Sequence, residues 1–141
     1  MKLEQMTMLP AHLMRRCLQM VTVYFADELA GYEMTQVQYA TLTAICNLGE
    51  CDATRVGKSI GLDKVTVGLV VKRLHARGLL AISQQPGDRR VRLLTLTVEA
   101  RRILEDVEEK VLRAQERLLD PLGPEQRSAL ITALRTIVDS G

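Results

Sequence analysis

The sequence predicts a mainly α-helical fold that contains one small β-hairpin, and three observations support this. Apolar residues recur at helical spacing in several segments. Asp or Thr residues stand where these segments begin, and glycines stand where they end. One pair of β-prone runs is separated by the turn sequence PGDR. A chain of 141 residues, 47% of them hydrophobic, is long enough to bury a core as one domain.

The first two elements are helices. Apolar side chains form one stripe from about Pro10 to Leu29, and Gly31 ends this helix. Thr35 is a suitable N-cap for the second helix, which we expect to end near residues 47–49.

Two short helices and a hairpin follow. Asp52 caps ATRVGKSI, which Gly61 ends, and Asp63 caps KVTVGLVVKRLHAR, which Gly78 ends. A short turn containing glycine between two helices is typical of a helix-turn-helix. The β-prone runs LLAISQQ and RVRLLTL come next, so the predicted architecture is a winged helix-turn-helix.

Two more helices complete the chain. Thr97 caps a long helix, the sequence DPLGP breaks it, and Pro124 suits the first position of the last helix. The first and last helices carry apolar stripes that nothing else in so short a chain covers, so we expect a homodimer built from both ends. The predicted segments of one compact unit are an N-terminal dimerisation helix (1–34), the winged helix-turn-helix (35–97) and C-terminal dimerisation helices (98–141).

Charge is distributed unevenly along the chain. Nine lysines and arginines but only three acids lie between Asp52 and Arg92, a net charge of +6. Because the whole chain carries +2, the remainder carries −4. A basic middle with acidic ends is typical of a module that binds nucleic acid, although a charged, solvated surface would give the same count.

Several classes of protein are not expected. We find no phosphate-binding loop, nucleophile elbow or metal-ligand spacing, so we expect neither an enzyme nor a metal, catalytic or cofactor site. No apolar run is long enough for a membrane span, and the N-terminus lacks the features of a secretory signal. Three cysteines without a C-x-x-C pair favour reduced, buried thiols in a cytoplasmic protein.

The order of elements and three motifs resemble the MarR family of bacterial transcription regulators. The family's hairpin motif D-x-R-x5-L-T is present as Asp88, Arg90, Leu96 and Thr97. The segment MTQVQYATL resembles the start of a family helix, and LDKVTVGLVVKRLHARGLL resembles the recognition helix and its exit. The resemblance implies a dimer that binds a pseudo-palindromic operator, with repression as the expected outcome.

The resemblance also implies roles for the basic residues. Arg90 would enter the minor groove, with Asp88 holding its guanidinium. The helix from Lys64 would enter the major groove, where Thr66 can hydrogen-bond a base or a phosphate and Val65 or Val67 can touch a thymine methyl. Phosphate contacts are expected from Arg55 and Lys58. Lys72, Arg73 and Arg77 are expected to contact phosphates or to pair with nearby acids. Arg89 and Arg92 are expected to contact phosphates or to form pairs on the strand face.

Members of this family usually bind a small aromatic anion. His12, Arg15 and Arg16 share one face of the first helix and could hold a carboxylate, with Tyr39 adding a ring edge or a hydroxyl. This face resembles that of MarR regulators of nicotinate catabolism, which implies a hydroxynicotinate as effector. The same residues could instead pair with acids of a partner subunit or face water.

Two other functions remain open at this stage. One is a thiol-based redox sensor, although Cys17 lies later in the first helix than the reactive cysteine of peroxide-sensing members and is expected to pack. The other is a winged helix that binds protein, in which case substitution of the hairpin arginines would not change the affinity for DNA.

Overall fold

The computed structural model describes residues 1–141, and the chain divides into two units. One unit comprises residues 1–28 and 111–141, and the other comprises residues 29–110. None of the helices combines the length and apolar composition needed to cross a membrane.

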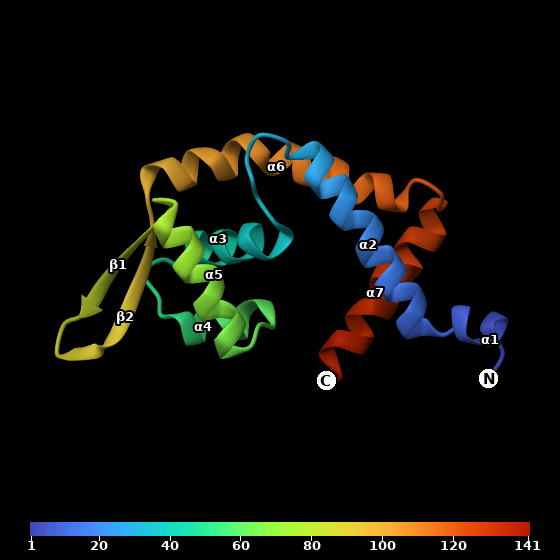
Figure 1. Cartoon of the computed structure of the whole chain (residues 1–141), viewed down its shortest axis with the longest axis horizontal. Helices are drawn as coiled ribbons and strands as arrows, with labels where there is room; N and C mark the ends of the chain where they lie inside the picture. Colours follow the sequence, from blue (N-terminus) through green and yellow to red (C-terminus); the bar gives the residue numbers. More distant parts are fainter. The chain divides into compact units, whose positions relative to one another are not determined.

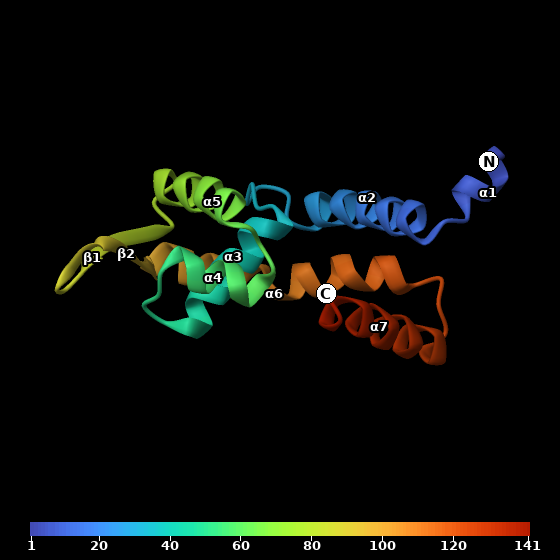
Figure 2. The ribbon, with the colours of Figure 1, turned by 90° about the horizontal axis from the view of Figure 1, so that it is seen from below.

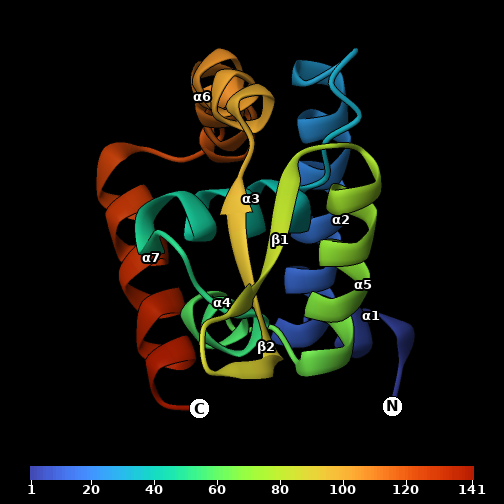
Figure 3. The same ribbon diagram turned by 90° about the vertical axis from the view of Figure 1, so that its left-hand side faces the viewer.

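The unit of residues 29–110 is a winged helix-turn-helix. Its elements are α3 (Gln36–Leu48), α4 (Ala53–Ile60), α5 (Lys64–Ala76), β1 (Leu80–Gln85), β2 (Asp88–Leu96) and the first part of α6 (Val98–Leu119). The two strands pair antiparallel, and the hairpin extends beyond the helices, with β1 beside α5 (Figures 1 and 3). The predicted fold class is therefore confirmed.

Local hydrogen bonds fix the residue at which α3 begins. The Thr35 hydroxyl accepts from the Gln38 backbone N–H at 3.1 Å, and the Gln38 side chain accepts from the Thr35 N–H at 3.1 Å. This capping box satisfies two N–H groups that a helix start leaves without partners.

The core of this unit joins the helices to the hairpin. Leu42 and Ile45 of α3, Val56 of α4 and Leu74 of α5 are almost fully buried. Leu94 of β2 exchanges two backbone hydrogen bonds with Cys51, at 2.7 and 3.3 Å. The hairpin is thus fixed to the segment that leads into α4, which orients the wing relative to the helix-turn-helix.

The second unit contains α1 (Leu3–Thr7), α2 (Pro10–Glu28), the end of α6 and α7 (Pro124–Asp139). The turn after α6 brings α7 back along the end of that helix (Figure 2). Glu28 of α2 pairs with Arg113 and Arg117 of α6, at 3.0 and 3.3 Å. These bonds lower the pKa of Glu28, and the Arg117 guanidinium also lies 4.3 Å from the centre of the Tyr24 ring.

Two helices of this unit expose apolar side chains in the single chain. On α2, Leu13 of the predicted stripe is exposed, as are Leu18 and Val23 on other sides of the helix, whereas Val21 of the stripe is buried. On α7, the exposed apolar residues are Leu130, Ile131, Leu134, Ile137 and Val138. This is the pattern from which the sequence predicts a homodimer.

The structure differs from the sequence-based prediction in three places. The short helix α1 was not predicted. Strand β2 begins at Asp88, two residues earlier than expected, so that Pro86 and Gly87 alone separate the strands. Only Cys51 is buried, whereas Cys17 and Cys46 are exposed in the chain, so the prediction of buried thiols is wrong for these two.

Candidate nucleic-acid interface

Two aspartates fix the starts of α4 and α5. Asp52 Oδ1 accepts from the Arg55 backbone N–H at 2.8 Å. Asp63 Oδ1 accepts from the Thr66 N–H at 2.9 Å, and its Oδ2 accepts from the Thr66 hydroxyl at 2.7 Å. These bonds from Thr66 lower the pKa of Asp63. Both N-caps were predicted, and both are confirmed.

A close backbone contact sets the turn between these helices. A Cβ atom at Gly57 would lie 2.8 Å from the Leu62 carbonyl oxygen and 3.1 Å from Cγ2 of Val67. Gly61 has a φ of 70° in the left-handed region, which glycine adopts without steric cost. The two glycines allow α4 and α5 to pack closely at the turn.

The two sides of α5 differ sharply in their exposure to solvent. Val67, Val70, Val71 and Leu74 face the core, whereas Val65 is 73% exposed. Of the two valines that could touch a thymine methyl, Val67 is therefore excluded, because its side chain is 1% exposed. Lys64, Lys72 and Arg73 are exposed, as expected for residues that contact DNA.

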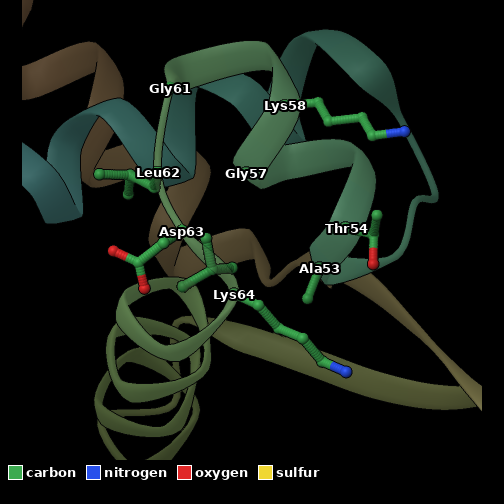
Figure 4. Close-up of a pocket in the computed structure, with 9 residues that line it drawn as sticks. Ala53, Thr54, Gly57, Lys58, Gly61, Leu62, Asp63 and Lys64 are labelled. Atoms are coloured by element: carbon green, nitrogen blue, oxygen red, sulfur yellow. The ribbon is translucent and has the colours of Figure 1, made fainter.

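A groove of about 480 Å³ lies where α4 approaches the start of α5 (Figure 4). The Lys58 and Lys64 side chains extend from the two helices toward the same side, and the Thr54 hydroxyl lies on that side as well. The Asp63 carboxylate points the other way. Two ammonium groups and a hydroxyl on one edge of a groove are suited to a backbone phosphate.

The tip of the hairpin carries an irregularity in β2. Gln84 pairs with Arg92 and Gln85 pairs with Asp88, so the residues between them on β2, Arg89 to Val91, form a bulge. Asp88 Oδ1 accepts from the backbone N–H of Arg90 at 3.0 Å, and the two side chains form no ion pair. The expectation that Asp88 holds the guanidinium is therefore corrected: its carboxylate fixes the backbone of the tip.

A second groove, of about 420 Å³, lies between α5 and the hairpin. Gly68, Lys72 and His75 line it from α5, and Arg92 lines it from β2. His75 Nδ1 is 2.9 Å from the Leu80 carbonyl oxygen, and because a carbonyl only accepts, Nδ1 carries the proton. The His75 imidazole is thereby held in place in the groove that Lys72 and Arg92 also line.

Arg77 has a role within the fold. Its guanidinium donates to the backbone oxygens of Glu33 at 2.8 Å and Tyr32 at 2.9 Å. Of the two roles expected for Arg77, pairing with an acid is wrong, because its bonds go to backbone oxygens, and a phosphate contact stays a prediction. Arg77 joins the end of α5 to the segment before α3.

The residues expected to hold an effector fall in both units. On α2, Arg15 Nη2 lies 3.4 Å from Nδ1 of His12. A guanidinium only donates, so Nδ1 accepts and the ring proton is on Nε2. Arg16 is exposed on the same helix, and Tyr39 is half-buried on α3 of the other unit.

Sequence reasoning missed three residues of the candidate interface: Thr54, Gly68 and Leu69. Leu69 is 55% exposed, one helical turn after Val65. The helical period would have placed Leu69 on the exposed face once Val70, Val71 and Leu74 were assigned to the core.

No group of three or more His, Cys, Asp or Glu side chains could hold a metal ion.

The fold and this surface define a winged helix-turn-helix protein with basic residues on α4, α5 and the wing. A model of the MarR family matches residues 32–91. The transcriptional repressor NicR of Pseudomonas putida is 30% identical over 129 residues, which cover 92% of this chain and 82% of NicR. The chain belongs to the MarR family.

Two solved structures extend the similarity. BpsR of Bordetella bronchiseptica, whose DNA binding is regulated by 6-hydroxynicotinic acid, is 32% identical with a TM-score of 0.87. The similarity covers 94% of this chain and 95% of BpsR. The transcriptional repressor CouR, bound to a 23-mer DNA duplex, is 26% identical with a TM-score of 0.86, over 98% of each chain.

Proposed function

We propose that this protein is a homodimeric transcriptional repressor that leaves its operator when it binds a small aromatic carboxylate, with 6-hydroxynicotinic acid as the first candidate. The observation that carries the proposal is the set of exposed cations on α4, α5 and the wing of one winged helix-turn-helix. The similarity to NicR and BpsR supports a regulator rather than an enzyme, and it supports this class of effector. Such a repressor acts where bacterial DNA is, in the cytoplasm.

The DNA contacts divide into three groups. Val65 and Thr66, at the start of α5, meet base edges in the major groove, and Lys64 beside them reaches the DNA backbone. Arg90, on the bulged tip of the hairpin, enters the minor groove, where a narrow A·T-rich segment has an enhanced negative potential. The remaining cations bind phosphates: Arg55, Lys58, Lys72, Arg73, Arg89 and Arg92.

The exposed apolar side chains of α2 and the apolar stripe of α7 supply the dimer interface. Leu18 is 58% exposed and Ile137 is 55% exposed in the single chain, and a second copy would remove both from water. A two-fold dimer presents two recognition helices, so its operator is a pseudo-palindrome with half-sites about one helical turn apart.

The effector site is built around α2. With His12 Nδ1 occupied by Arg15, the Nε2–H of His12 is available to donate to a carboxylate. Arg16 can bind the same carboxylate through two parallel hydrogen bonds. Tyr39 is a further candidate, but the proposal depends on the three residues of α2.

The salt dependence of DNA binding tests the proposed interface. Each phosphate contact contributes about one unit to the slope of log affinity against log salt concentration. We expect Lys58→Ala and Lys64→Ala each to reduce this slope by about one per half-site. Unchanged slopes in both variants would show that the groove in Figure 4 does not meet the DNA backbone.

A variant that separates the two activities tests the effector site. Arg16→Ala is expected to bind operator DNA as tightly as the wild type and to lose release by 6-hydroxynicotinic acid. Gln19→Ala, an exposed polar residue one turn further along α2, is the matched control and should still be released. Release of the Arg16→Ala variant at the wild-type concentration of the acid would contradict the assignment.

A further inference from the structure

The exposed face at the start of α5 carries large apolar side chains. Val65 is 73% exposed and Leu69 is 55% exposed, and the helix places them one turn apart on the same side. Cations flank them: Lys64 precedes Val65, and Lys72 lies one turn beyond Leu69. An apolar strip between cations is suited to a partner that is anionic at its edges and offers apolar groups between them.

Gly68 lies beside this strip, on the shoulder of α5 that lines the groove toward the hairpin. A Cβ atom at Gly68 would meet no heavy atom within 4 Å, in contrast to the close contacts at Gly57. Packing within the unit therefore accounts for Gly57 and not for Gly68. Glycine is unfavourable in a helix interior, and its use is to let another surface approach the backbone closely.

Few hydrogen-bonding groups occupy the same part of α5. Arg, Lys, Asn and Gln are the side chains that make paired hydrogen bonds to guanine or adenine. Among residues 64–69 the one such residue is Lys64, whose side chain extends to the side of Lys58 and Thr54 (Figure 4). The one hydroxyl there, on Thr66, already donates to Asp63 at 2.7 Å. Discrimination among bases by this part of the helix must therefore rely largely on apolar contact.

We propose that α5 recognises its operator through the C5-methyl groups of thymine, which Val65 and Leu69 contact in the major groove. The bare backbone at Gly68 lets the helix approach closely enough for these contacts. The thymine methyl is the apolar group that a base pair presents in the major groove. This inference rests on the proposed function, because it requires that α5 enters DNA.

The test compares thymine with deoxyuridine, which lacks only the methyl group. The full-length protein first selects a duplex from a random-sequence library, and each thymine of a half-site is then replaced in turn. Wild-type affinity should fall about four-fold for each contacted methyl, and about fifteen-fold when the matching thymines of both half-sites are replaced.

Variants identify the side chains involved. Leu69→Ala and Val65→Ala should bind the thymine duplex more weakly, and each should lose the preference for thymine at one position. Val98→Ala changes another exposed valine, at the start of α6, and should retain the full preference. Gly68→Ala should fold normally and bind both duplexes more weakly.

The outcomes separate this inference from the function on which it rests. Failure to select any duplex would overturn both. Tight binding that is indifferent to every thymine replacement would overturn the methyl contacts and leave DNA binding intact. A preference for thymine that persists in both alanine variants would show that other residues read the methyl groups, and it would also overturn the inference.

Discussion

The Asp88 carboxylate accepts a hydrogen bond from the backbone N–H of Arg90 at 3.0 Å, within the bulged tip of the hairpin. This bond orders the main chain at the point where the wing would meet the minor groove. A fixed tip lowers the entropy that Arg90 loses when it binds DNA, because only its side chain remains to be ordered.

Substitutions at Asp88 can distinguish a backbone role from a role of charge. Asp88→Asn keeps an oxygen that can accept from Arg90 N–H, so we expect near-wild-type affinity for operator DNA. Asp88→Ala removes the acceptor and should weaken binding about five-fold, and Arg90→Ala should weaken it at least about ten-fold. Equal losses in the two Asp88 variants, measured by fluorescence anisotropy, would instead indicate that the carboxylate charge acts on the guanidinium.

The two glycines of α4 and α5 should respond in opposite ways to alanine. Gly57→Ala places a methyl group 2.8 Å from the Leu62 carbonyl oxygen and should lower the thermal unfolding midpoint by several degrees. Gly68→Ala meets no atom of the protein and should raise the free energy of unfolding by up to about 1 kcal/mol. A loss of stability in Gly68→Ala equal to that in Gly57→Ala would contradict the packing described for the turn.

The cap on α5 should make stability depend on pH in the acid range. Hydrogen bonds from Thr66 lower the pKa of Asp63 below its ordinary value of 3.8. The stabilisation is therefore fully present above that ordinary value, and it is lost as the pH falls through the lower pKa of the folded state. Asp63→Ala should be less stable than the wild type at pH 7, and this difference should shrink below about pH 4.

Thermal unfolding followed by circular dichroism across that pH range measures the effect. Glu105→Ala, at an exposed carboxylate in the middle of α6, is the control and should differ little from the wild type at any pH. A constant difference between Asp63→Ala and the wild type down to pH 2 would show that the carboxylate does not act through its charged form.

A charge on the apolar stripe of α7 should dissociate the dimer. Leu134 is 39% exposed in the single chain, and a second copy would bury it. Leu134→Asp should sediment as a monomer at micromolar concentration and lose most operator affinity, since one half-site contact remains. Val98→Asp, at a more exposed apolar residue outside the stripe, should remain dimeric.

Local interactions explain which parts of the fold could be predicted from the sequence. The Asp63 cap depends on Thr66 three residues later, so residue type and spacing identify it. The partners of Arg77 lie 44 and 45 residues away, at Glu33 and Tyr32, and no local pattern connects them. The bonds that join Arg77, an exposed residue, to the segment before α3 were therefore not predicted.

The candidate interface was predicted in part for a similar reason. Composition and motif placed the cations on α4, α5 and the wing, and the structure shows them exposed. Which of Val65 and Val67 faces outward depends on the rotation of α5 against its neighbours, which the core settles by burying Val67. Residue type alone did not show that Gly68 lacks a packing role, because that requires the positions of the surrounding atoms.

The affinity of the wild-type protein for its selected duplex, with and without 6-hydroxynicotinic acid, tests the central claim most directly. Fluorescence anisotropy should show tight, salt-dependent binding that the acid reverses and that benzoate reverses less well. Binding unaffected by the acid and lost on treatment with peroxide would contradict the proposed effector and indicate a cysteine switch. Binding no tighter than to unrelated DNA would contradict the proposed function itself.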